Sequence, residues 1–96
     1  MKINQLINKN DLNKSPAKSG VYWLYKKLKS GWDVVYIGIG KNINRRLFQH
    51  KRDAIKDFDA FYYEEAIYSE ARKREQVILK SYKDSTGRFP IYNRQT

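Results

Sequence analysis

Residues 20–40 read GVYWLYKKLKSGWDVVYIGIG, and this stretch predicts the centre of the fold. Two runs rich in β-branched and aromatic residues, 20–26 and 33–37, lie on either side of the turn signal Lys29-Ser30-Gly31. Two such runs joined by a short glycine-containing loop predict an antiparallel hairpin. Gly38-Ile39-Gly40 ends the second strand.

Two helices and one more strand are predicted after the hairpin. Asn42 is a suitable N-cap for a helix over 43–55, whose apolar residues recur at helical spacing. A third strand is expected over 59–66, and Ser69 is expected to cap a second helix over 70–82. This order predicts an α+β domain, with a small three-stranded antiparallel sheet flanked by two or three helices.

The chain before the hairpin reads as a polar lead-in over 1–19. Ile3, Leu6 and Ile7 have helical spacing, so a short helix is expected there. A length of 96 residues favours one domain, and we place it at 20–96.

Charge is the strongest signal in the composition. Twenty Lys and Arg against ten Asp and Glu give a net charge of +10, which favours a polyanionic partner such as nucleic acid. A basic surface that serves only solubility is the alternative. The chain has no cysteine, which excludes disulfides, thiolate metal sites and cysteine nucleophiles and fits a cytoplasmic, intracellular protein. No apolar run approaches the length of a signal peptide or a membrane span.

Glu75 is the first candidate for chemistry. It falls within the apolar stripe of the second predicted helix, where a carboxylate costs free energy unless something pairs with it. One interpretation is an ion pair with Arg46, Arg72 or another of the many cations. The other is a metal ligand or general base, because carboxylate oxygens suit hard cations such as Mg²⁺.

Arg46 and His50 are spaced i and i+4, so they share a face of the first predicted helix. The guanidinium of Arg46 matches a phosphate, and His50 can donate or carry a proton. A lone histidine beside apolar helix positions can equally be a packing residue. Tyr22 and Tyr36, one on each hairpin strand, are two further candidate site residues. Tyrosines in strands usually pack, so packing is the alternative for both.

The first predicted helix is also strongly basic, and glycines precede it. Backbone N–H groups at such a helix start can meet a phosphate. We expect substrate contacts from Gly38, Lys41, Arg45 and Lys51.

These residues, in this order, resemble the GIY-YIG nuclease family. Gly20-Val21-Tyr22 is similar to the first signature of the family, and Tyr36-Ile37-Gly38 is the second signature. Arg46 stands eight residues after that glycine, where the family has an arginine. His50 matches a histidine that several members carry one helical turn later.

The resemblance continues to Asn93 and so covers about three quarters of the chain. Ala71-Arg72-Lys73-Arg74-Glu75, followed by aliphatic residues, is similar to the pattern around the metal-binding glutamate of the family. Pro90-Ile91-Tyr92-Asn93 is similar to the closing motif of the family domain, which implies that Asn93 supports the site and contacts substrate.

The resemblance implies metal-dependent hydrolysis of a phosphodiester, with Glu75 holding one Mg²⁺ or Mn²⁺. Arg46 would hold the scissile phosphate. Tyr22 would take a proton from the attacking water, with its phenol pKa lowered by the metal and nearby cations. Tyr36 would orient water or phosphate, and His50 would assist proton transfer or bind phosphate.

Two other functions fit the same charge. The chain could be a non-catalytic nucleic-acid-binding module on the same fold, or an accessory subunit of a larger nuclease. In every case we expect nucleic acid as the partner, with DNA favoured over RNA, and a monomer or homodimer.

Overall fold

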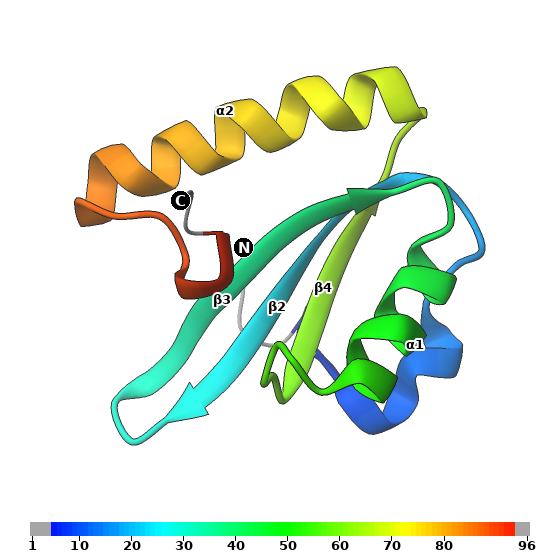
Figure 1. The fold of residues 1–96 in the computed structure, drawn as a ribbon, viewed down its shortest axis with the longest axis horizontal. Helices are drawn as coiled ribbons and strands as arrows, with labels where there is room; N and C mark the ends of the chain where they lie inside the picture. Colours follow the sequence, from blue (N-terminus) through cyan, green and yellow to red (C-terminus); the bar gives the residue numbers. More distant parts are fainter. Residues whose placement is uncertain (1–4, 94–96) are drawn as a thin grey trace.

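The computed structural model describes residues 5–93 and has one layer of strands with helices on both sides (Figure 1). The antiparallel sheet has the strand order β1-β4-β2-β3. The elements in chain order are β1 (Ile7–Asn8), η2 (Lys9–Lys14), β2 (Gly20–Leu28), β3 (Gly31–Gly40), α1 (Ile43–Asp53), β4 (Ala60–Glu65), α2 (Tyr68–Thr86) and η3 (Ile91–Asn93). The α+β class with one antiparallel sheet is confirmed, but the sheet has four strands instead of three.

The additional strand lies in the segment before the hairpin. Ile7 pairs with Phe61 and Asn8 pairs with Ala60 of β4. The prediction of a short helix at these positions is therefore wrong for Ile7, while Ile3 lies outside the described residues. Helical spacing marks only residues that share a face, and here the open edge of β4 pairs with the chain before a helix starts. The 3-10 helix η2 follows, with the Asn8 side chain accepting from the Asn10 N–H at 2.8 Å.

The β2–β3 hairpin is longer than predicted and is close-packed at its glycines. Tyr22 lies opposite Gly38 and Leu24 opposite Tyr36, with a register shift after Leu24. Because side chains alternate across a sheet, Tyr22, Tyr36 and Gly38 share one face. A Cβ at Gly38 would lie 2.6 Å from Cε2 of Tyr36 and 2.8 Å from Oη of Tyr22. Only glycine lets the two rings close over this strand.

Each face of the sheet has its own core. Helix α1 and η2 cover the face that carries Tyr22, whereas α2 covers the opposite face (Figure 1). The buried residues on the α1 side are Leu12, Tyr22, Leu24, Val35, Ile43, Leu47, Phe58 and Phe61. Those on the α2 side are Val21, Ile37 and Ala71. Leu12 belongs to the first group, so the described part of the lead-in packs into the same core as the hairpin.

The start of α1 agrees with the prediction, and the start of α2 does not. The Asn42 side chain accepts from the Arg45 N–H at 3.0 Å, which confirms the N-cap. Helix α2 begins at Tyr68 after Ile67, which makes no side-chain cap bond, so Ser69 is not the N-cap. The Ala66 N–H donates to the Ser19 carbonyl at 3.0 Å, and this non-local bond fixes where the chain leaves the sheet. Among the described residues, no helix is long and apolar enough to cross a membrane.

Candidate functional site

Three aromatic side chains from three elements meet on the α1 face of the sheet. Tyr22 of β2 is fully buried, and its Oη lies 2.7 Å from Nε2 of His50 on α1. The ring of Tyr36 on β3 lies 6.1 Å from the ring of Tyr22 and 5.5 Å from that of His50, between centroids. The structure therefore brings together three of the predicted site residues that are far apart in the chain.

Burial controls the protonation of this cluster. Burial raises the pKa of the Tyr22 phenol, and Tyr36 acts in the same direction, while Arg46 opposes the change. We expected a lowered pKa for Tyr22. In the protein without a metal that expectation is wrong, because desolvation of the buried phenol outweighs the effect of the Arg46 charge. Burial also lowers the pKa of His50 to about 4, with Arg46 and Lys56 adding to the effect. At neutral pH the imidazole is uncharged, and in the tautomer protonated at Nδ1 its Nε2 accepts a hydrogen bond that the Tyr22 hydroxyl donates.

The lowered pKa of His50 predicts a stability loss on acidification. Between pH 6.5 and about 4 the unfolded chain protonates His50 and the folded protein does not. Stability therefore rises with pH in this window and is lost as the pH falls through it. We expect a loss of about 1–3 kcal/mol, measured by urea unfolding across the window. His50→Gln should flatten this slope, and an unchanged slope in that variant would contradict the assignment.

Arg46 lies beside the tyrosines, and its neighbour Arg45 does not. A Cβ at Gly40 would lie 2.8 Å from Cγ of Arg46, so this glycine makes room for the arginine stem. The Arg46 guanidinium donates to Oε1 of Gln49 at 2.8 Å, and its charge acts on both phenols. Arg45 is exposed and contributes its backbone N–H to the helix cap.

This difference predicts separate effects for the two arginines. If the chain cuts nucleic acid, as the resemblance implies, Arg46→Ala should weaken nucleic-acid binding by roughly tenfold and slow cleavage by about 10²–10³-fold, because the charge that would hold the reacting phosphate is lost. Arg45→Ala should weaken binding a few-fold and reduce its salt dependence, with the cleavage step unchanged. Binding by fluorescence anisotropy and single-turnover cleavage measure both effects. If only Arg45→Ala lost cleavage, the phosphate-holding role would belong to Arg45 and not to Arg46.

Lys56 is a site residue that the sequence did not single out. It lies in the loop between α1 and β4, and its Nζ is 4.8 Å from the centroid of the Tyr36 ring. A pocket of about 80 Å³ borders His50, Lys51 and Lys56. In the sequence, Lys56 is only one of several cations in a basic stretch. Its position over the Tyr36 ring depends on how the chain turns after α1, which the sequence pattern does not show.

The remaining predicted cations are open to solvent. Lys41, Arg45 and Lys51 are exposed, and none of them forms an ion pair within residues 5–93. The Lys41 Nζ lies 5.3 Å from the centroid of the Tyr68 ring. These charges are available to phosphates. Gly38, in contrast, is buried beneath the tyrosine rings.

Asn93 joins the end of the described chain to the edge of the sheet. Its Oδ1 accepts from the Ile37 N–H at 2.8 Å, and its Nδ2 donates to the Ile37 carbonyl at 2.9 Å. Ile37 lies between Tyr36 and Gly38, so this pairing holds the strand that carries the site. Because both ends of the amide are engaged with backbone, Asn93 has the geometry of a supporting residue.

Glu75 lies on α2, away from these contacts. Its neighbours on the helix stripe, Ala71 and Ile78, pack on the sheet face opposite Tyr22. The carboxylate is half-buried, and burial raises its pKa while Arg72 opposes the change. Within residues 5–93 it forms no ion pair or side-chain hydrogen bond, and no cluster of three or more His, Cys, Asp or Glu side chains could hold a metal. The ion pair considered for Glu75 is thus not formed, and no contact joins it to the tyrosines.

No protein-family model matches this chain, and no curated protein matches it. The resemblance described above therefore depends on the residues themselves and on their arrangement.

Proposed function

We propose that this chain is a divalent-metal-dependent endonuclease of the GIY-YIG type that hydrolyses nucleic acid, with DNA favoured over RNA. The observation that supports this most directly is the 2.7 Å contact of Tyr22 with His50. It gives a buried phenol a neutral acceptor for its proton in a chain of net charge +10. A surface that only binds phosphates needs cations and has no use for this pair.

The residues of the cluster suit successive parts of a hydrolysis. The exposed cations of α1 would attract the backbone, and Arg46 would hold the scissile phosphate as its charge grows. Tyr22 would accept a proton from the attacking water while its own proton passes to Nε2 of His50. The charge of Arg46 would favour the tyrosinate character that develops in this transfer.

Glu75 is the residue that would hold a metal ion. A half-buried carboxylate without an ion pair in the described chain suits Mg²⁺ or Mn²⁺, which bind through one or two carboxylates and several waters. The ion would stabilise charge on the leaving oxygen. A single carboxylate is consistent with one ion.

One observation favours a second function. Because no contact joins Glu75 to Tyr22 and the two side chains belong to elements on opposite faces of the sheet, a non-catalytic nucleic-acid-binding module also fits. In that function Tyr22 and His50 would be core residues, and an accessory subunit of a larger nuclease would look the same.

A cleavage assay separates these functions. Labelled single-stranded, duplex and branched DNA and RNA would be incubated with Mg²⁺, with Mn²⁺ and with EDTA. Metal-dependent cutting would support the nuclease and identify its substrate class. Salt-sensitive binding without cutting of any substrate would overturn the enzymatic proposal and leave the binding module.

A further inference from the structure

A groove bordered by described residues lies beside the cluster and has no role in the function proposed above. It encloses about 520 Å³ between the turn end of the β2–β3 hairpin, the loop before β4 and the segment that follows α2. Its apolar lining comes from Leu28, Val35, Phe89, Ile91 and Tyr92. Leu28 and Ile91 are 44% and 51% exposed, so the groove presents apolar and aromatic surface to solvent.

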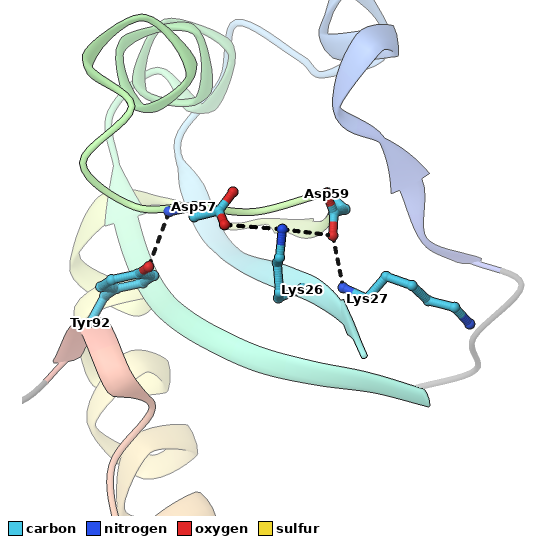
Figure 2. Close-up of polar contacts among 5 residues, drawn as sticks. All are labelled: Lys26, Lys27, Asp57, Asp59 and Tyr92. Atoms are coloured by element: carbon cyan, nitrogen blue, oxygen red, sulfur yellow. Dashed lines mark hydrogen bonds and ion pairs between the residues drawn. The ribbon is translucent and has the colours of Figure 1, made fainter. Parts of the chain in front are cut away.

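A network of polar contacts holds one wall of this groove in place (Figure 2). Lys26 Nζ lies 3.0 Å from Asp57 and 3.4 Å from Asp59. Asp59 also accepts from the Lys27 N–H at 2.9 Å, and the Asp57 N–H donates to the Tyr92 hydroxyl at 3.3 Å. The aromatic ring and the carboxylate of the wall are therefore positioned before any ligand arrives.

The charge of the groove differs from that of the whole chain. Two cations, Lys26 and Arg88, are matched by two carboxylates, Asp33 and Asp57, whereas the chain carries +10. Arg88 is 4.0 Å from Asp33, so the rim consists of ion pairs. Carboxylates at the rim repel phosphates, so the groove disfavours the nucleic-acid backbone. Aromatic walls and fixed acceptors instead suit an uncharged ring that donates hydrogen bonds.

The groove adjoins the small pocket beside the candidate catalytic cluster at Asp57. Asp57 lines both the groove and the small pocket beside His50 and Lys56. Val35 of the groove directly precedes Tyr36, over whose ring Lys56 lies. A nucleotide with its phosphate at Lys56 would therefore have its base near the groove.

We propose that this groove is a base-binding subsite for a nucleotide next to the scissile phosphate, and that it selects bases with an exocyclic amino group. Phe89 and Tyr92 supply the aromatic surface, and Asp33 and Asp57 accept from the amino group of cytosine, adenine or guanine. Thymine and uracil lack that donor, so they bind less well. This inference depends on the proposed function for the identity of the ligand.

The test uses binding to the metal-free full chain, so it does not require cleavage. Amide chemical shifts would be followed by NMR during titration with each deoxynucleoside 5′-monophosphate and with deoxyribose 5-phosphate, which has no base. We expect the amides of Val35, Asp57 and Phe89 to shift with dCMP, dAMP and dGMP, less with dTMP, and not with the sugar phosphate. Phe89→Ala should weaken the base-dependent binding by roughly tenfold. Phe48→Ala, which removes an exposed phenylalanine that does not line the groove, is the matched control.

Asp33→Asn provides a second variant that keeps the size of the side chain. It should reduce the preference for amino-bearing bases without loss of folding. Shifts confined to Arg46, Lys51 and Lys56 with every ligand, the sugar phosphate included, would overturn the subsite and leave the nuclease proposal intact. Equal shifts in the groove for dTMP and dCMP would overturn the base preference.

Discussion

Glu75→Gln is expected to abolish metal-dependent cleavage, with a loss on the order of 10³-fold or more, and to leave the fold intact. The substitution keeps the shape of the side chain and removes the charge that would hold the ion. Burial raises the pKa of Glu75, so the charged carboxylate is less favourable in the folded chain than in the unfolded chain. Replacing it with the neutral amide should therefore not lower the free energy of unfolding. Single-turnover cleavage with Mg²⁺ and thermal unfolding measure the two effects.

A control on the same helix is available for this variant. Glu70 lies in the first turn of α2 and is exposed, so Glu70→Gln removes an equal charge without touching the proposed metal site. Titration with Mn²⁺ adds a readout that does not depend on activity: the wild-type chain should bind one ion that Glu75→Gln does not bind. If Glu75→Gln cuts as fast as the control, the carboxylate is not the metal ligand.

Tyr22→Phe is expected to slow cleavage by about 10²–10⁴-fold while nucleic-acid binding survives. The phenol is the group that would exchange protons with water and with His50, and phenylalanine preserves the ring that fills the core. The loss of its hydroxyl leaves Nε2 of the buried His50 without its partner, so stability should fall by about 1–3 kcal/mol.

Tyr63→Phe is the matched control, because Tyr63 pairs directly with Tyr22 across β2 and β4 on the same face of the sheet. It should cut normally. An unchanged rate in Tyr22→Phe, with a loss in Tyr36→Phe, would move the general base to the second tyrosine. An unchanged rate in both would assign the tyrosines to packing alone.

The parts of this protein that the sequence determined are local in origin. The hairpin follows from two β-prone runs around Gly31, and the N-cap of α1 follows from Asn42. The i, i+4 spacing was enough to place Arg46 and His50 on one helix face, where periodicity and capping act between residues that are near one another in the chain. That Tyr22 and Tyr36 share a site with them was implied only by the resemblance.

Only the tertiary structure decided the features that depend on distant partners. Pairing of Ile7 with Phe61 made a strand where spacing suggested a helix, and α2 starts at Tyr68, two residues after the Ala66 N–H that donates to the Ser19 carbonyl. Burial reversed the expected pKa shift of Tyr22, and the turn after α1 brought Lys56 to Tyr36. Burial and non-local contacts depend on what the folded chain places around a residue, and the spacing of neighbouring residues does not contain that information.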